Sequence, residues 1–254
     1  MTLFDLTGKV AIVTGSTRGI GRASAEALAE HGAKVVISSR KQDACEAAAA
    51  DLNERYGDGT AIAVAASISD KAALQRLVDE TRAAWGRIDV LVCNAASNPY
   101  YGPMEGIADD QFRKILDNNI VSNLWLIAMV APEMRERGAG SIVIVSSIGG
   151  LRGSPVIGAY CVSKAADMQL ARNLAVEYGP HGVRVNCVAP GLIKTDFARA
   201  LWENPERIRA ANERVPLRRI GEPHEIAGAV VYLASPASSF MTGQVIVVDG
   251  GATI

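Results

Sequence analysis

The segment 9–30 constrains the fold of this chain more than any other. It reads KVAIVTG, STRGIG and RASAEALAE in succession. An apolar run at 10–13, just before Gly15, is too short for an ordinary helix and predicts a buried strand. Beyond Gly21 the apolar residues recur at helical spacing, which predicts a helix. Strand, glycine-rich turn and helix are the layout of a unit that binds phosphate groups.

The three glycines of this turn have different expected tasks. Gly15 permits a left-handed turn, Gly19 lets the backbone approach a ligand, and Gly21 lets helix and strand pack closely. Unpaired N–H groups at the helix start then face an anion, aided by the positive end of the helix dipole. The spacing G-x-x-x-G-x-G differs from the standard dinucleotide fingerprint G-x-G-x-x-G. A tight structural turn without a ligand therefore stays open as an alternative at this point.

Composition and charge argue against several classes of protein. Of the 254 residues 49% are hydrophobic, which is ample for one continuous core, and the formal net charge of −1 argues against a nucleic-acid binder. No apolar run reaches the ~18 residues of a membrane span, and the N-terminal MTLFDLTGK does not resemble a signal peptide. The four cysteines lie far apart without any C-x-x-C. We expect a globular cytoplasmic protein with reduced thiols.

Strands and helices alternate along the rest of the chain. Further strands are predicted at 33–38, 61–66, 88–93, 141–145, 183–188 and 244–249, and further helices at 43–55, 70–85, 109–137, 159–178 and 223–234. Ser69 is the expected cap of the second of these helices, with Asp70 in its first turn. This alternation predicts an α/β fold: a doubly wound (Rossmann) parallel sheet of seven strands, ordered 3-2-1-4-5-6-7, with helices on both faces. The ligand crevice is then expected at the carboxyl ends of the strands. No linker or repeat divides the chain, so we expect a single domain over 1–254, with a substrate-loop region at about 190–219.

Tyr160 and Lys164 are the residues most suited to chemistry. The chain lacks a G-x-S-x-G elbow, a G-x-x-x-x-G-K-[ST] loop and metal-ligand spacing among its histidines, which argues against hydrolase, nucleoside-triphosphatase and zinc functions. Four apart on a predicted helix, Tyr160 and Lys164 share one face. A nearby ammonium favours the phenolate and lowers the pKa of a tyrosine towards the range useful for general acid–base catalysis. Chance alone produces this spacing in many helices. The position of the pair in the fold is more informative. The preceding strand ends at Ser146-Ser147, at the rim of the sheet where the glycine turn lies. Ser147 can hydrogen-bond a substrate carbonyl there.

Several short motifs follow one another along the chain. They are Thr14-Gly15-x-x-x-Gly19-Ile20-Gly21, Asn94-Ala95, Asn119, Ser147, Tyr160-x-x-x-Lys164 and Pro190-Gly191. In order and spacing they resemble the short-chain dehydrogenase/reductase family, from Leu6 to Gly251. Two departures stand out: Ala96 occupies a position where the family usually has glycine, and Ser67 one where it often has an aspartate facing the adenine.

The resemblance implies a role for each of four residues. Tyr160 would protonate a carbonyl oxygen while hydride arrives from a nicotinamide, and Ser147 would orient that oxygen. Lys164 would hold the nicotinamide ribose and lower the pKa of Tyr160, and Asn119 would position a water that relays protons to Lys164. The implied cofactor-binding residues are Gly15, Thr17, Arg18, Gly19, Ile20, Ser39, Arg40, Ile68, Asn94, Ala95, Tyr160, Lys164, Pro190, Gly191, Ile193 and Thr195.

The residues after the second strand bear on the choice of cofactor. NAD-binding proteins of this build place a carboxylate there for the adenine ribose 2′-OH, and that charge would repel a 2′-phosphate. This chain has SSRK at 38–41 and Arg18 in the glycine turn. Two guanidiniums grip a phosphate through forked hydrogen bonds. We therefore expect NADP(H) to be preferred over NAD(H), the alternative being that Arg40 and Lys41 merely begin a solvated helix.

The substrate end of the site is expected to be apolar and rich in aromatic rings. Its predicted wall consists of Tyr100, Tyr101, Phe197, Leu201 and Trp202. The alternative is that these side chains fill subunit or core contacts. The runs SSRKQ, NPYYG and APGLIKT further resemble the NADPH-dependent carbonyl reductase and retinol dehydrogenase branch. We expect reversible reduction of ketone or aldehyde carbonyls to alcohols.

Two other functions remain open. A 3-oxoacyl-thioester reductase acting on an acyl carrier protein or CoA would need a basic patch, for which Arg207, Arg209, Arg214, Arg218 and Arg219 are candidates; a solvated helical face is the alternative. A catalytically silent dinucleotide-binding scaffold or sensor is disfavoured by the retention of Asn119, Ser147, Tyr160 and Lys164. Because the apolar run 244–249 lies at the sheet edge and family members commonly assemble, we expect a homotetramer, with a dimer as the alternative. We expect no nucleic acid, membrane or metal as a partner.

Overall fold

Seven parallel strands form one central sheet in the computed structural model, which describes residues 2–254 and, of Arg207, only the backbone. The order β3-β2-β1-β4-β5-β6-β7 confirms the predicted one. The strands are β1 Val10–Thr14, β2 Lys34–Ser38, β3 Ala61–Ala63, β4 Val90–Cys93, β5 Gly140–Val145, β6 Val183–Pro190 and β7 Val245–Val248.

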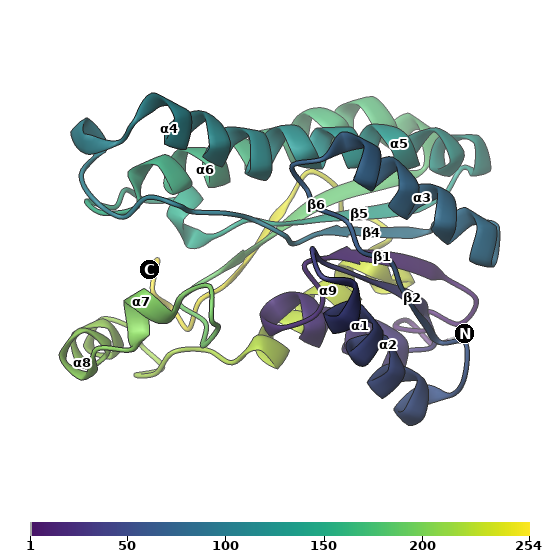
Figure 1. Ribbon diagram of the computed structural model, residues 1–254, viewed down its shortest axis with the longest axis horizontal. Coiled ribbons are helices and arrows are strands. Elements are labelled where there is room, and N and C mark those ends of the chain that lie inside the picture. Colours follow the sequence, from purple (N-terminus) through teal and green to yellow (C-terminus); the bar gives the residue numbers. More distant parts are fainter. Residues whose placement is uncertain (1) are drawn as a thin grey trace.

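Helices cover both faces of the sheet, as Figure 1 shows. The helices of the chain are α1 Gly19–Glu30, α2 Gln42–Tyr56, α3 Lys71–Trp85, α4 Asp109–Leu116, α5 Ser122–Arg137, α6 Gly158–Tyr178, α7 Arg199–Trp202, α8 Pro205–Glu213 and α9 Pro223–Ala234. Of these, α7 and α8 lie away from the sheet (Figure 1). The core is accordingly split into two layers. Side chains alternate along each strand, so Ile12 packs with α3, α5 and α6 on one face while its neighbour Val13 packs with α1, α2 and α9 on the other.

The two-sided burial explains why the strands read as continuous apolar runs. All five residues of β1 are buried, and β2, β4, β5 and β6 are almost as fully covered. The two edge strands are less covered: two of the three residues of β3 are half-buried, and β7 stays partly exposed along its length. Within residues 2–254 no helix combines the length and the apolar character that a membrane crossing needs.

The helix predicted at 109–137 has the expected ends, but it is not α-helical throughout. A π turn at Asp117–Val121 separates α4 from α5. Its asparagines form contacts that straight helical propagation does not require: Asn118 Nδ2 donates to Ser97 Oγ at 2.9 Å, and Asn119 Nδ2 donates to the Ser97 carbonyl at 3.1 Å. Apolar periodicity cannot detect one extra residue per turn, which is why the sequence predicted a single helix.

The cap of α3 also differs from the prediction. Asp70 itself is the N-cap, and its Oδ1 accepts hydrogen bonds from the backbone N–H groups of Ala72 and Ala73 at 2.9 and 3.1 Å. The hydroxyl of Ser69 instead contacts Ser67 Oγ at 2.9 Å. The helix therefore begins one residue later than expected, at Lys71.

Replacing Asp70 with alanine tests this cap. We expect Asp70→Ala to lower the free energy of unfolding by about 1 kcal/mol, because two N–H groups at the start of α3 lose their acceptor. Ser69→Ala is the matched control and is expected to change it by less than about 0.5 kcal/mol. Urea denaturation measures both, and equal losses would contradict the assignment of the cap.

Candidate active site

The glycine-rich turn lies between β1 and α1 and leaves the start of α1 open to an anion. Gly15 and Gly19 have φ values of +67° and +58°, the left-handed region that favours glycine. A Cβ on Gly21 would collide with the carbonyl oxygen of Gly15, so helix and turn pack as closely as expected. Arg18 is the N-cap of α1, and its side chain forms no capping hydrogen bond. The first N–H groups of α1 therefore keep the arrangement that binds phosphate.

Thr14 and Asn94 join this turn to the neighbouring strand β4. The Thr14 hydroxyl oxygen accepts hydrogen bonds from the backbone N–H groups of Asn94 and Ala95, both at 3.0 Å. In return, the amide of Asn94 donates to the Thr14 carbonyl at 2.8 Å and to the Gly15 carbonyl at 3.3 Å. The carboxyl ends of β1 and β4 are thus tied directly beneath the turn.

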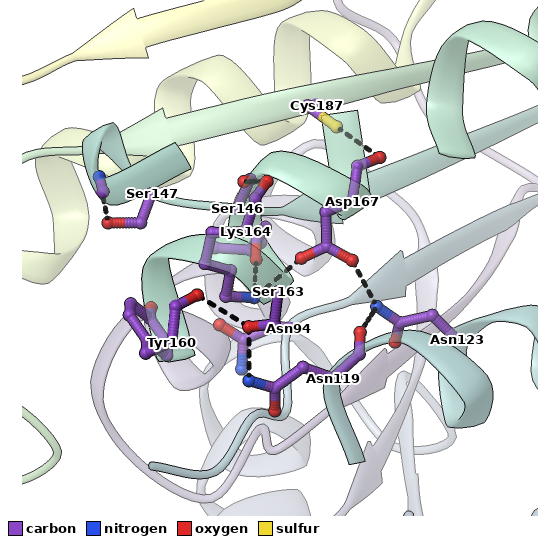
Figure 2. Close-up of polar contacts among 12 residues, drawn as sticks. Asn94, Asn119, Asn123, Ser146, Ser147, Tyr160, Ser163, Lys164, Asp167 and Cys187 are labelled. Atoms are coloured by element: carbon purple, nitrogen blue, oxygen red, sulfur yellow. Dashed lines mark hydrogen bonds and ion pairs between the residues drawn. The ribbon is translucent and has the colours of Figure 1, made fainter. Parts of the chain in front are cut away.

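The start of α6 brings Tyr160 and Lys164 to the end of β5, where Ser146 and Ser147 stand (Figure 2). Ser146 is buried and donates to the Lys164 carbonyl at 2.7 Å, which anchors helix to strand. Ser147 is half-buried, and its hydroxyl oxygen accepts the Gly149 N–H at 3.0 Å. The lysine Nζ lies 5.6 Å from the centroid of the Tyr160 ring. Helical spacing has therefore placed both side chains at one site.

The balance of effects on Tyr160 differs from the expectation. Burial raises the pKa of Tyr160, and it outweighs the ammonium of Lys164 and a hydrogen bond with Ser147, both of which lower that pKa. The carboxylate of Asp167 raises it further. The predicted effect of Lys164 has the right sign, but the net shift of the pKa is upward. The phenol therefore stays protonated at neutral pH in this state, which suits a proton donor.

Lys164 is buried, and two acceptors within the chain hold its ammonium. Its Nζ donates to Asp167 Oδ2 at 2.9 Å and to the Val145 carbonyl at 2.9 Å. Burial alone lowers the pKa of this amine, but Asp167 and Tyr160 more than offset it and raise the pKa above its ordinary value. Lys164 therefore stays protonated at neutral pH and places a positive charge beside Tyr160.

Asn119 lies in the π turn and joins three segments of the site. Its Oδ1 accepts the Ser97 N–H at 2.8 Å, and its Nδ2 donates to Ser163 Oγ at 3.0 Å. Its carbonyl oxygen accepts the amide of Asn123 at 2.7 Å. In this structure Asn119 therefore orders the loop after β4 against α6; a role in holding a water stays a prediction.

The segment after β6 reaches both the glycine turn and Tyr160. The Gly191 N–H, next to Pro190, donates to the Val248 carbonyl at 2.9 Å, and Ile193 is buried. An added Cβ on Gly19 would stand 3.2 Å from the methyl group of Thr195. Two residues later, the Phe197 ring lies 5.9 Å from that of Tyr160.

The other predicted pocket residues are less closely tied to Tyr160. The Trp202 indole donates to the Thr195 carbonyl at 2.9 Å, Leu201 is half-buried, and Tyr101 is exposed. The hydroxyl of Tyr100 turns back onto its own loop and donates to the Pro103 carbonyl at 2.7 Å. Among the five, Phe197 alone has a ring contact with Tyr160 within residues 2–254.

At the end of the site predicted to hold the adenosine, Arg40 is exposed just beyond β2 and forms no ion pair with any described residue. Ser39 is held by Cys45, whose sulfur accepts its N–H at 3.1 Å. The guanidinium of Arg18 forms an ion pair with the carboxylate of Asp196 at 3.1 Å. Both partners are exposed, so this bond is weak and can exchange for a phosphate. Half-buried Ile68 packs at the margin of the core.

The arginines of the late segment do not form a uniform basic patch. Arg219 forms an ion pair with Glu225 at 2.6 Å, and Arg218 donates to the Glu213 carbonyl. Arg209 and Arg214 are exposed, and the side chain of Arg207 lies outside the described part. No group of acidic, cysteine or histidine side chains in the described residues is arranged to hold a metal ion.

Comparison with known proteins places this geometry in a family. The model of the family described as enoyl-(acyl carrier protein) reductase matches residues 15–253. Dehydrogenase/reductase SDR family member 4 of Homo sapiens is 44% identical over 247 residues, 97% of this chain and 88% of that protein. The chain belongs to the short-chain dehydrogenase/reductase family.

Solved structures of two similar proteins hold different nicotinamide cofactors. A gluconate 5-dehydrogenase from Burkholderia cenocepacia in complex with NADP and tartrate has a TM-score of 0.93 and 31% identity, over 99% of this chain and 97% of that one. A 7α-hydroxysteroid dehydrogenase complexed with NADH and 7-oxo glycochenodeoxycholic acid has a TM-score of 0.93 and 34% identity, over 98% and 96%. This short-chain dehydrogenase/reductase is therefore an NAD(P)-dependent oxidoreductase. Its preference between the two cofactors depends on its own residues.

The residues present fit a dinucleotide. The uncapped start of α1, beside the left-handed glycines of the turn, suits a pyrophosphate. Thr195 and Phe197 reach from the turn to Tyr160. A nicotinamide placed along this segment would stand beside the phenol.

The sequence analysis assigned no part in the site to Asn123, Ser163 or Asp167. Ser163 donates to the Tyr160 carbonyl at 2.7 Å, and Asn123 Nδ2 donates to Asp167 Oδ1 at 3.1 Å. One signal was available for Asp167: an acid three residues after Lys164 on one helix is close enough to pair with it.

The Thr14 hydroxyl supplies a test of how β1 and β4 are joined. We expect Thr14→Val to lower the free energy of unfolding by about 2 kcal/mol, because the N–H groups of Asn94 and Ala95 lose their acceptor. Thr14→Ser retains the oxygen and is expected to cost less than about 1 kcal/mol. Urea denaturation measures both; a valine variant as stable as the serine variant would contradict this role.

Proposed function

We propose that this protein reduces ketone or aldehyde carbonyl groups to alcohols, reversibly, with NADPH as the preferred hydride donor. The observation that carries the proposal is the grouping of Ser147, Tyr160 and Lys164 at the carboxyl edge of the sheet, the edge at which the glycine turn follows β1. Bound NADPH would supply the hydride. The residues of the chain would bind the carbonyl, hold it and provide the proton.

The proton would come from the Tyr160 hydroxyl. Burial and Asp167 raise the pKa of this group, so it holds its proton at neutral pH, and the ammonium of Lys164 stabilises the phenolate left after transfer. Ser147 would donate a hydrogen bond to the same carbonyl oxygen and orient it. As charge develops on that oxygen, both groups stabilise it more strongly than the neutral carbonyl.

The substrate would lie under the segment that carries Phe197. This exposed ring lies with its centroid 5.9 Å from that of Tyr160, which supports an apolar carbonyl compound over a small charged acid. Trp202 and Thr195 hold the segment together through the indole hydrogen bond. A charged acyl carrier is less well supported, because Arg219 is already paired with Glu225.

An assembly of several copies is part of the proposal. Large apolar side chains are exposed on α5, on α6 and around β7: Leu124, Val162, Val176, Phe240 and Val247. An exposed apolar edge strand and apolar helix faces favour covering by further copies. We propose a homotetramer.

Tyr160→Phe tests the catalytic role. We expect a fall in kcat of roughly 100- to 10,000-fold with a panel of ketones and aldehydes, because the proton donor is lost. NADPH binding, followed by nucleotide fluorescence, should change little, since the ring and Lys164 remain. A variant with unchanged turnover would refute the proposed chemistry. A wild-type protein inactive on the whole panel, including acyl thioesters, would refute the function.

Arg40→Asp tests the choice of cofactor. The ratio of kcat/KM for NADPH over NADH should fall roughly 10- to 100-fold, because a charge-assisted contact with the 2′-phosphate is lost and a repulsive charge gained. Arg76→Asp, an exposed arginine on α3, makes the same change in net charge away from the site. If both variants shift the ratio equally, or neither does, Arg40 does not select the cofactor.

A further inference from the structure

A buried acid stands behind Lys164. Asp167 has no exposed surface, and its carboxylate contacts Lys164 Nζ through Oδ2 at 2.9 Å and Asn123 Nδ2 through Oδ1 at 3.1 Å. A carboxylate buried in this way is costly unless it is paired and hydrogen-bonded, and both conditions are met here. Figure 2 shows the chain of contacts that runs from Lys164 through Asp167 and Asn123 to Asn119.

The pair determines where the ammonium can lie. A lysine ammonium has three N–H donors, and two of them are taken by Asp167 and the Val145 carbonyl. The third is left for the side of the site where Tyr160 lies, with its ring centroid 5.6 Å from Nζ. Without the carboxylate, the flexible lysine chain would have one protein acceptor instead of two.

The pair also determines how much net charge Tyr160 experiences. An ammonium alone favours the phenolate, whereas a carboxylate at a similar depth opposes it. Other titratable groups that face the pair are Cys161 on α6, Cys93 on β4 and Cys187 on β6; α5 and the π turn contribute the neutral amides Asn123 and Asn119. Burial raises the pKa values of all three thiols, so they are neutral at physiological pH. Asp167 is therefore the nearest negative charge to both Tyr160 and Lys164 among the described residues.

We propose that Asp167 is a positioning residue, whose buried carboxylate holds the Lys164 ammonium in place and sets how strongly that charge acts on Tyr160. The proposal rests on the proposed function only through its kinetic test. Asp167 is not proposed to contact the substrate or the cofactor. It acts on the phenol through Lys164 and through its own charge.

Asp167→Asn is the central variant, because it keeps the shape of the side chain and removes its charge. Whichever of Tyr160 and Lys164 gives up the first proton, loss of the nearby negative charge makes that step easier. The alkaline limb of kcat/KM for carbonyl reduction should therefore move to lower pH by roughly one unit or more. Asp167→Glu retains the charge and should keep the limb near its wild-type position.

Asp89→Asn is the matched control. Asp89 is also a buried carboxylate paired with a cation, Arg87, but it stands before β4, at the opposite edge of the sheet. A general effect of losing a buried acid would lower stability or rate in both variants without moving the limb. A limb that stays at the wild-type pH in folded Asp167→Asn would overturn the proposal.

A second measurement does not depend on turnover or on the survival of a variant. Carbon-13 NMR of the wild-type protein with labelled tyrosine and lysine follows Tyr160 and Lys164 directly, with Tyr160→Phe used to assign the ring signal. We expect Lys164 to titrate above the ordinary lysine value, because its carboxylate partner offsets burial. Titration below that value would overturn the proposal, even if Asp167→Asn does not fold. An inactive wild-type protein with the expected titration would refute the proposed function and leave this inference standing.

Discussion

Parallel pairing of β1 with β4 and of β4 with β5 is the constraint on which the site depends. The registers Ile12 with Leu91 and Leu91 with Ile142 bring the carboxyl ends of three strands to one edge. The glycine turn and the start of α6, far apart in the sequence, come to the same edge of the sheet as a result. The mutual hydrogen bonds of Thr14 and Asn94 then hold the first two of these ends together.

Opposing electrostatic effects act on the Tyr160 hydroxyl at this edge of the sheet. Burial favours the neutral phenol of Tyr160, the ammonium of Lys164 favours the phenolate, and Asp167 reduces the effect of the ammonium. Such a balance leaves a donor that holds its proton at rest and a cation ready to stabilise the charge formed when the proton leaves. A lysine without a partner at this depth would tend to lose its own charge instead.

Physical patterns in the chain explain how much of this was predictable. Apolar runs such as 10–13 and the spacing of Tyr160 and Lys164 report on neighbours within one element, and the predictions that rest on them agree with the structure. Two predictions about helices failed where a polar side chain can hydrogen-bond with more than one nearby group. Asp70 caps α3 in place of Ser69, and the π turn around Asn119 interrupts a helix whose periodicity looked continuous.

Patterns along the chain were enough to predict the seven strands and their alternation with helices, and the handedness of parallel crossovers was enough to predict their order in the sheet. These follow from periodicity and from chirality, which act along the chain. Only the folded chain shows that the Lys164 ammonium meets the Val145 carbonyl, that Arg18 pairs with Asp196, and that the Phe197 ring lies against that of Tyr160. Such contacts depend on distances between segments remote in sequence and on burial, which changes the energy of a charge by more than any local preference does.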